Sequence, residues 1–446
     1  MRKASLIWIA PMFAAWVSAQ AASTVTDADR QKAYKEFREL FDARKYSEAL
    51  PVAEKIVEMT EAQYGANDRA LANPLTNLAT VHYRMKDFPA AEKDYERSVQ
   101  ILEQTSGAAD RALLRPLHGL GASHFAEKEY LDASVALKRA IDLSRNLDGL
   151  FNVEQLQILD PLISSYIALD LTADAEKEQQ YALRVAETAY GRSDARMLKP
   201  LDRYGRWLEQ LGRYTTARLL YARALTIAET AGGRGSILAV EPLQGIARSY
   251  RLEFVNGAEE AAQAPDPFGS DAMPITADGQ RMNPDGERAL RLALAAIEKA
   301  QPIDHQKRGD TLVELGDWYM SAGALAKGQD VYREAWKDLA QVNNTKLLEG
   351  PRILAYRPPP SSARRSKIPP DEAEEHYVEV RYTVLKDGRT DKVELANSDA
   401  AESTQKSVVS AMKKARYAPR MENGEPVDTP DVAFRERILV KAKKSS

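Results

Sequence analysis

Five alanines stand at a constant interval of 42 residues in the first half of the chain. An aromatic residue stands three positions before the alanine in four of the five periods. A fixed period of this length indicates a stack of similar supersecondary units. A single unit buries little apolar surface, so the units of such a stack share one continuous core. The five positions are Ala49, Ala91, Ala133, Ala175 and Ala217.

Each period contains two amphipathic stretches with helical spacing. In the second period, Leu75 and Leu78 mark the apolar side of the first stretch, and Val99 and Leu102 mark that of the second. A short polar turn at residues 86–87 separates them, which predicts an antiparallel helical hairpin. Because helix axes in such pairs lie about 8–10 Å apart, we expect the repeated alanines where the two helices cross.

The pattern within a period resembles the tetratricopeptide repeat. The residues that carry the resemblance in the second period are Leu78, Ala79, Phe88, Ala91, Tyr95 and Ser98. The 42-residue length is similar to the long variant found in kinesin light chains. The resemblance implies a solenoid of helical hairpins, with a groove lined by the first helix of each hairpin. Thr172 and Gln179 depart from the pattern, so we expect the fourth hairpin to be poorly packed.

The repeat register predicts a solenoid of about seven hairpins over residues 27–341. An insertion at residues 256–285 separates the two helices of the sixth hairpin. Four aspartates in it could suggest calcium, but their spacing does not match a calcium-binding loop. A flexible excursion is the favoured interpretation. The aspartates are Asp266, Asp271, Asp278 and Asp285.

The N-terminus resembles an export signal. Arg2 and Lys3 precede an apolar run over residues 6–17, and Ala19 and Ala21 form a small-residue cleavage pattern. The run is about half the length that a spanning helix needs. We therefore expect a signal peptide over residues 1–21, cleaved near Ala21. The alternative is an inner-membrane anchor formed by the same segment.

Residues 342–370 break the helical pattern with prolines and arginines. Such a composition favours extended backbone, and we expect a basic, solvated tether. From residue 371 the period changes to two, with a turn at 387–388, a helix at 401–415 and a last strand at 431–441. The predicted fold class is therefore mostly α, a helical-hairpin solenoid followed by a small α+β domain.

The last part of the chain, residues 371–446, resembles the TonB C-terminal domain. The resemblance is carried by the Asp387-Gly388-Arg389 turn, the run 393–398, Arg416-Tyr417-Ala418-Pro419 and the run 423–427. It implies a bacterial periplasm. It also implies that an extended peptide of an outer-membrane receptor adds to a sheet edge. The expected acceptor edge is the last strand, residues 431–441.

The sequence offers little support for catalysis. It contains no cysteine, and no phosphate-binding loop, nucleophile elbow or metalloprotease helix is present. His82 and His124 occupy the same place in two periods, which indicates packing, and no matching carboxylate pair completes a metal site. We expect no enzyme activity, cofactor or metal. A net charge of −3 gives no attraction to nucleic acid.

The repeat register also predicts which side chains face the groove. Basic and aromatic side chains suit peptide recognition, because arginine pairs with carboxylates through two hydrogen bonds. The alternative is that these are ordinary surface residues. The candidates are Thr80, Tyr83, Arg84, His118, Phe125, Arg206 and Arg248.

These observations favour a non-enzymatic periplasmic scaffold. Its groove would bind a protein partner, and its C-terminal domain would bind a receptor or cell-envelope peptide by strand addition. The alternative is an accessory or energy-transducing component of TonB-dependent transport across the outer membrane. An enzyme that uses the insertion as a lid is a third, more distant hypothesis.

Overall fold

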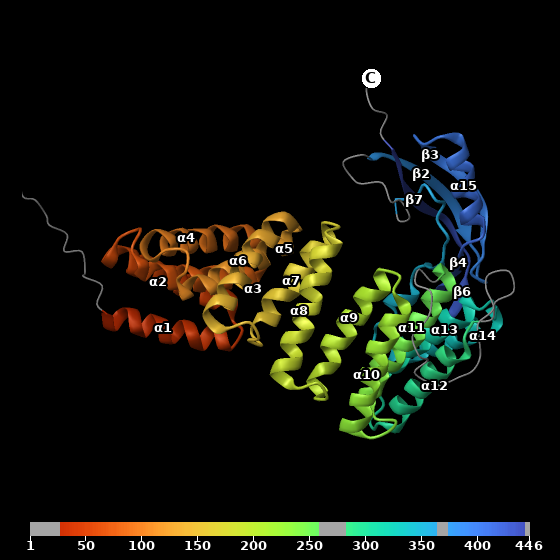
Figure 1. Ribbon diagram of the computed structural model, residues 1–446, viewed down its shortest axis with the longest axis horizontal. Helices are drawn as coiled ribbons and strands as arrows, with labels where there is room; N and C mark the ends of the chain where they lie inside the picture. The colour runs from red at the N-terminus through yellow and green to blue at the C-terminus, as the bar shows by residue number, and fades with distance from the viewer. Residues whose placement is uncertain (1–26, 258–281, 364–372, 442–446) are drawn as a thin grey trace, which may run out of the picture. The chain divides into compact units, whose positions relative to one another are not determined.

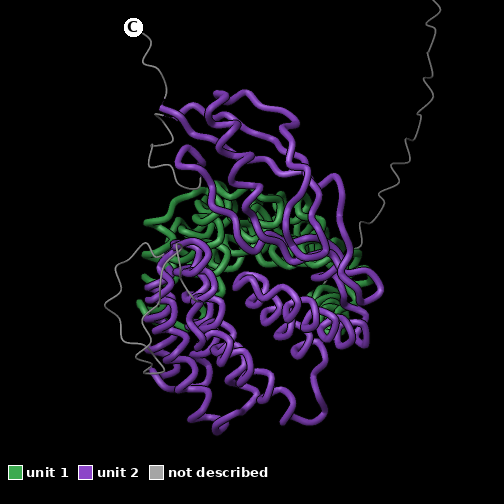
Figure 2. Tube along the Cα trace, turned by 90° about the vertical axis from the view of Figure 1, so that its right-hand side faces the viewer, with its two compact units in different colours: residues 1–178 green, residues 179–446 purple. Residues whose placement is uncertain are grey.

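A computed structural model describes residues 27–257, 282–363 and 373–441 (Figure 1). The predicted signal peptide and most of the predicted insertion lie outside these residues. The chain divides into two compact units, Met1–Glu178 and Gln179–Ser446 (Figure 2). The division falls within helix α8 (Thr172–Tyr190), in the hairpin whose packing positions depart from the repeat.

Unit 1 consists of antiparallel helices joined by short turns. Each helix packs on the one that follows it from α1 to α7. Two short 3-10 turns precede the first helices of the second and third hairpins. The elements are α1 (Asp27–Asp42), α2 (Tyr46–Tyr64), η1 (Arg69–Leu71), α3 (Ala72–Met85), α4 (Phe88–Ser106), η2 (Arg111–Leu113), α5 (Leu114–Glu127), α6 (Tyr130–Asp148) and α7 (Gln155–Ala168).

Unit 2 continues the same architecture. Helix α12 packs on α11, although the insertion separates them in sequence. The elements of this helical part are η3 (Ala195–Met197), α9 (Leu198–Gln210), α10 (Tyr214–Gly232), η4 (Ile237–Ala239), α11 (Val240–Asn256), α12 (Pro284–Lys299), α13 (His305–Ser321), α14 (Leu325–Gln341) and η5 (Lys346–Leu348).

The repeated alanines are completely buried. All five are 0% exposed, which confirms their predicted place between crossing helices. Glycine serves the same purpose at other positions. A Cβ added at Gly205 would lie 2.5 Å from the Tyr221 ring, and one at Gly245 would lie 2.6 Å from it. The ring of Tyr221 therefore fills the space that two glycines leave on successive first helices.

The turns within the first five hairpins use a left-handed residue at a repeated position. Lys86 has φ of 67° and Lys128 has φ of 68°, while Gly212 occupies the equivalent place with φ of 74°. Asp87 then caps α4 by accepting a hydrogen bond from the amide of Ala90 at 3.3 Å. These residues end one helix and start the next within a few positions, which keeps the two helices antiparallel.

The C-terminal domain contains a three-stranded antiparallel sheet in the order β3-β2-β7, with α15 packed on β3 and β2 (Figure 1). Two smaller pairs, β1 with β4 and β5 with β6, complete it. The elements are β1 (Arg352–Ala355), β2 (Ala373–Val384), β3 (Thr390–Ser398), α15 (Glu402–Lys413), β4 (Arg416–Ala418), β5 (Arg420–Glu422), β6 (Glu425–Val427) and β7 (Thr429–Lys441).

The segment predicted as a solvated tether is different in the structure. Residues 352–355 form β1, which pairs with β4 of the C-terminal domain. Leu354, Tyr356 and Ser362 are buried, and the Tyr356 ring meets Phe434 at 5.0 Å. The prolines were a correct sign of extended backbone, but an extended segment can also complete a sheet. The tether prediction is therefore wrong for residues 352–363, and residues 364–370 lie outside the described part.

The C-terminal domain is docked on the last hairpin of unit 2. Ala418 and Met421 share a buried apolar cluster with Leu312, Val313 and Met320 of α13. Helical stacks need a cap over their terminal apolar surface, and the domain provides it.

Candidate functional site

A basic surface lies on the first helices of unit 1. A pocket of about 650 Å³ is lined by Lys35 and Arg38 from α1 and by Asn73 from α3, and the acidic Glu39 and Asp42 of α1 line it as well. Arg115 of α5 reaches this surface by donating to the side-chain oxygens of Asn73 at 3.4 Å and Asn77 at 3.2 Å. We call the set Lys35, Arg38, Asn73, Asn77, Arg84 and Arg115 the basic face.

Three arginines of the basic face have no acidic partner among the described residues. Arg38 and Arg84 are exposed without a hydrogen bond to a side chain, and Arg115 bonds only to neutral amides. On the second helices of the same unit, by contrast, Arg97 pairs with Glu61 and Arg139 with Glu103. These arginines of the second helices are therefore neutralised internally. On the basic face Lys35 lies 4.0 Å from Glu39, whereas the three arginines keep their positive charge for an anionic ligand.

The repeat register already contained the signal for the residues that sequence reasoning missed. Arg38 precedes the candidate Thr80 by one period, and Asn73 precedes Arg115 by one period. The predicted groove positions begin with the second hairpin, so Arg38 of the first hairpin is not among them.

Three of the predicted groove residues are occupied by contacts within their own hairpin. The Thr80 hydroxyl lies 3.0 Å from that of Tyr95 and donates to the Thr76 carbonyl at 2.7 Å. The ring of Tyr83 packs edge-on against Phe88, with centroids 5.5 Å apart. In the next hairpin, the ring of Phe125 packs against Tyr130 at 5.7 Å. These side chains mainly support the hairpin, although the two rings remain partly exposed.

His118 is half-buried on α5, next to the basic face in sequence. Burial lowers the pKa of its imidazole, and a hydrogen bond with the main chain of Gln157 acts in the opposite direction. The net direction favours the neutral ring, which can donate or accept one hydrogen bond but adds no charge.

The two candidates of unit 2 are engaged in ion pairs. Arg206 is exposed and bonds to Asp202 one turn earlier at 2.8 Å. Arg248 is only 14% exposed and bonds to Glu209 at 2.8 Å, to the Tyr221 hydroxyl at 3.2 Å and to Glu314 at 3.5 Å. Arg248 of α11 therefore links its own helix to the neighbouring first helices α9 and α13 through largely buried contacts.

Burial controls the protonation of this network. It lowers the pKa of Arg248, but the carboxylates of Glu209 and Glu314 outweigh that effect and the net shift is upward. Burial also raises the pKa of Glu314 to about 7, against the opposing pull of Arg248. The Glu314 side chain is 28% exposed, yet its Oε2 atom is fully buried without a hydrogen bond. The raised pKa follows from the position of that atom.

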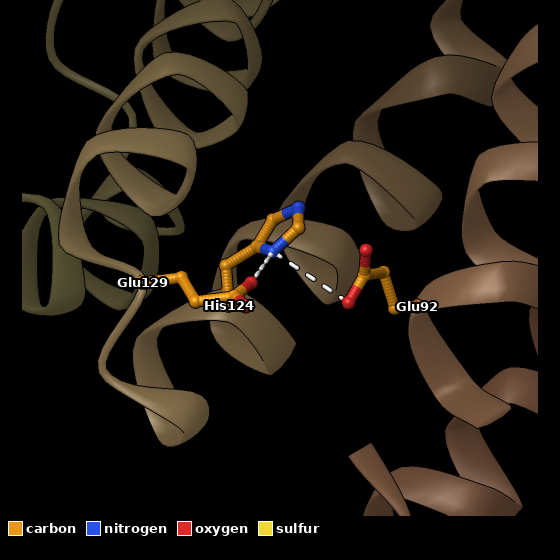
Figure 3. A group of neighbouring side chains, drawn as sticks. All are labelled: Glu92, His124 and Glu129. Carbon is orange, nitrogen blue, oxygen red and sulfur yellow. Dashed lines mark hydrogen bonds and ion pairs between the residues drawn. The ribbon is translucent and has the colours of Figure 1, made fainter. Parts of the chain in front are cut away.

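One histidine of unit 1 lies between two carboxylates (Figure 3). The Nδ1 atom of His124 is 2.7 Å from Glu129 Oε2 and 3.8 Å from Glu92 Oε2. One ligand atom from each residue could serve a metal ion, since these atoms all lie within 4.8 Å of one another. The sequence alone does not reveal this carboxylate pair, because Glu92 comes from the preceding hairpin.

The short distance in this cluster is that of a hydrogen bond. Glu129 immediately precedes α6 and His124 lies in the last turn of α5, so the bond joins the two helices across their turn. His82 occupies the equivalent place one period earlier, and its Nδ1 atom lies 3.9 Å from Asp87, which likewise immediately precedes the next helix. Its Nε2 atom lies 3.7 Å from Asp94 of α4. The repeated arrangement supports the packing role that the sequence predicted.

A second candidate site is the outer edge of β7. Strand β7 lies at the border of the sheet, and its other side pairs with β2 along most of its length. Among the described residues, Ala433 and Arg435 form no hydrogen bond on the outer side through their main-chain groups. At Arg437 and Leu439 the chain's own residues 361–363 occupy this edge.

Two family descriptions match separate parts of the sequence. Residues 40–104 and 71–146 match "Tetratricopeptide repeat", and residues 370–435 match "Gram-negative bacterial TonB protein C-terminal". The chain carries tetratricopeptide repeats followed by a TonB C-terminal domain. The predicted resemblance to both families and the predicted fold class are confirmed. No curated protein matches the sequence.

Several solved structures are similar to the chain at low identity. A putative kinesin light chain of Podosopora anserina with nearly identical repeats is 14% identical, covers 45% of this chain and 95% of its own, and superposes with a TM-score of 0.42. BtubC (BKLC) from P. vanneervenii is 15% identical, with coverages of 67% and 90% and a TM-score of 0.38. The apo form of RapI is 13% identical, with coverages of 71% and 99% and a TM-score of 0.42.

Within the described ranges, no helix combines the length and apolar character required to cross a membrane. The N-terminal segment that the sequence predicts as a signal peptide, or alternatively as an anchor, is not among these residues.

Proposed function

We propose that the chain is a periplasmic interaction scaffold whose basic face binds an acidic segment of a protein partner. Both domain types are typical of protein-interaction scaffolds. The observation that carries the proposal is the group of three arginines, Arg38, Arg84 and Arg115, that no acidic side chain neutralises among the described residues. Arginine binds carboxylates through two parallel hydrogen bonds, so an acidic peptide is the ligand that suits this surface.

The pocket beside Arg38 gives the proposal a second element. It is concave and includes the partly buried ring of Tyr34, whose pKa is raised by burial. A peptide with an apolar or aromatic residue next to its acidic residues would place that residue in the pocket. Charge would then determine how fast the partner associates, and the pocket would contribute to how long it stays.

Binding of a defined probe tests this part of the proposal. The probe is a fluorescent peptide of alternating glutamate and tryptophan, compared with one in which lysine replaces glutamate. We expect the acidic peptide to bind and its affinity to fall with added salt, because surface charges are screened. Equal binding of both peptides, independent of salt, would contradict the proposal.

A second candidate function is participation in TonB-dependent transport. Among the described residues, nothing pairs with the outward main-chain groups of Ala433 and Arg435 at the edge of β7. This favours the second function, because a receptor peptide could pair with them as an added strand. The docked position of the domain limits how such a role is tested. Deleting residues 371–446 would expose Leu312, Val313 and Met320, so point substitutions on β7 are required.

Ala433→Pro removes an outward amide hydrogen, and proline is tolerated on edge strands. Ala433→Ser keeps the amide and is the matched control. If the chain accepts receptor strands, outer-membrane receptors captured from a detergent extract of the cell envelope are lost with the proline variant and retained with the serine variant. Equal recovery with both variants would exclude strand addition at this edge.

A further inference from the structure

The outer edge of β7 is occupied at one end by the chain itself. The amide of Ala363 donates to the carbonyl of Arg437 at 2.8 Å, and the amide of Leu439 donates to the carbonyl of Ser361 at 3.0 Å. Ser362 lies opposite Ile438 in an antiparallel bridge. Residues 361–363 therefore form a short additional strand beside β7, which we call the edge segment.

A buried polar contact holds the edge segment in place. The hydroxyl of Ser362 donates to Oε1 of Glu436 at 2.6 Å, and both side chains are fully buried, at 0% and 1% exposure. A buried carboxylate is unfavourable unless it is hydrogen-bonded. Glu436 interrupts an apolar series on β7 that includes Phe434 and Ile438. Its place in that series has a physical reason, because it provides the acceptor for Ser362.

Further contacts set the position of the edge segment along the strand. Its amide at Ser362 donates to the carbonyl of Pro359 at 2.9 Å, which closes a tight turn just before it. Upstream of that turn, the buried ring of Tyr356 packs against Phe434. The register of the edge segment on β7 is therefore fixed from two sides, by the turn and by the Glu436 contact.

The edge segment divides β7 into two parts. Main-chain groups of alternate residues in a strand point to the same side, so Ala433, Arg435, Arg437 and Leu439 share the outer edge. The first two are open among the described residues, and the other two face the edge segment. A partner strand longer than about three or four residues would meet the edge segment.

We propose that the edge segment is an intramolecular competitor for the strand-addition site of β7. This inference rests on the proposed strand addition and specifies its site. Within the described part of the resting chain, the stretch at Ala433 and Arg435 is the one that accepts a partner, which is an extended peptide. A longer partner strand pairs with all of β7 only after the edge segment has left. Because the competitor is part of the same chain, its effective concentration is high, and it blocks weak partners.

Amide hydrogen exchange of the full chain without any partner tests whether the edge segment is held. Ser362→Asp places a second carboxylate against that of Glu436, and the repulsion should release the edge segment from β7. Ser361→Asp is the control, since its side chain points to the other side of the strand. We expect the Leu439 amide to exchange at least about tenfold faster in the first variant and unchanged in the control. Ile438, which pairs with β2, should stay protected in both variants, which shows that the domain remains folded.

A second variant avoids an added charge. Ala363→Pro removes the amide that bonds to Arg437 and should also accelerate exchange at Leu439. If Leu439 exchanges in the wild-type chain as fast as the open amide of Ala433, the edge segment is not held and the inference is overturned.

Competition is tested with a synthetic peptide of this chain's own residues 357–366. We expect it to bind the full-length Ala363→Pro chain at least about tenfold more tightly than the wild-type chain, in which the site is filled. Equal affinity for both chains, or binding to neither, would overturn the competitor role. The capture of receptors, which tests the proposed transport function, is not part of this experiment. A failure to capture receptors would therefore leave the result with the peptide unaffected.

Discussion

Arg352 and Asp317 form a bidentate ion pair that links the start of β1 to α13. The Arg352 nitrogens Nη1 and Nη2 lie 3.0 and 2.7 Å from the two oxygens of the Asp317 carboxylate, which is buried. The Tyr332 hydroxyl donates to the same carboxylate at 2.6 Å. Together with the apolar cluster at Met421, this pair makes the C-terminal domain a structural cap of the solenoid.

Replacing Arg352 with methionine should destabilise unit 2 substantially. The substitution leaves the buried carboxylate of Asp317 with one neutral partner, and we expect a loss of about 2–4 kcal/mol in the free energy of unfolding. The control is Arg333→Met, which breaks an exposed pair with Glu425 and should cost less than about 1 kcal/mol. Denaturant unfolding measures both values. Equal losses in the two variants would show that the Arg352 pair is not a fastening point.

Enlarging the repeated alanines should overpack the hairpins. Ala91 and Ala133 are 0% exposed between crossing helices, so leucine at either position should destabilise by about 1–3 kcal/mol. Ala109→Leu, at an exposed turn, serves as the control and should stay within about 0.5 kcal/mol of the wild type. Thermal unfolding compares the three variants. A neutral result at both buried positions would mean that the helices do not cross at the alanines.

Glycine should be favoured at the left-handed turn positions. Lys86 and Lys128 adopt positive φ, which is unfavourable for a residue with a Cβ, whereas the equivalent Gly212 adopts it without cost. Lys86→Gly should therefore stabilise unit 1 by up to about 1 kcal/mol, and Gly212→Ala should destabilise unit 2 by about the same amount. The denaturant concentration at the unfolding midpoint shows whether each variant is more or less stable than the wild type. A destabilised Lys86→Gly variant would argue against this turn geometry.

The network around Arg248 should make stability depend on pH through Glu314. The pKa of Glu314 is raised to about 7 in the folded chain from its usual value of 4.5. Below about pH 4.5 the group is protonated in both folded and unfolded chains and has no effect. As the pH rises to about 7, the unfolded chain loses the proton first, so Glu314 increasingly destabilises the fold.

Glu314→Gln should remove this dependence. Relative to the wild type, the variant should gain stability between about pH 4.5 and 7 and keep a constant advantage of up to about 3 kcal/mol above that. Denaturant unfolding at pH 5, 6, 7 and 8 measures the difference. A difference that shrinks as the pH rises would have the wrong sign for a raised pKa.

The repeat pattern is sufficient to predict the solenoid, because its main packing positions recur once in every period. The buried alanines and the turn at Lys86 follow directly from it. Contacts between hairpins were harder to predict. The repeat register predicts the Arg248 side chain in the groove. In the structure it is enclosed by Glu209 and Glu314, which come from the neighbouring hairpins.

The segment before the C-terminal domain could not be predicted for a related reason. Proline and arginine in residues 342–370 are equally typical of a tether and of an edge strand. The residues whose contacts determine which of the two forms are distant in sequence. Ser362 meets Glu436, which is 74 residues later, and β1 meets β4. Glu436 was visible as an exception in an apolar strand, but its partner could not be identified from the sequence alone.

The central claim is that the basic face of unit 1 binds an acidic partner, and charge reversal tests it most directly. The variant combines Arg38→Glu, Arg84→Glu and Arg115→Glu. The control combines Arg44→Glu, Lys55→Glu and Lys93→Glu, which make the same charge change at exposed positions outside the basic face. Proteins captured from a periplasmic extract are quantified by mass spectrometry. We predict a partner that the wild type and the control retain and that the variant loses by at least about tenfold, roughly 1.4 kcal/mol. Equal recovery of every protein by the variant and the control would contradict the account.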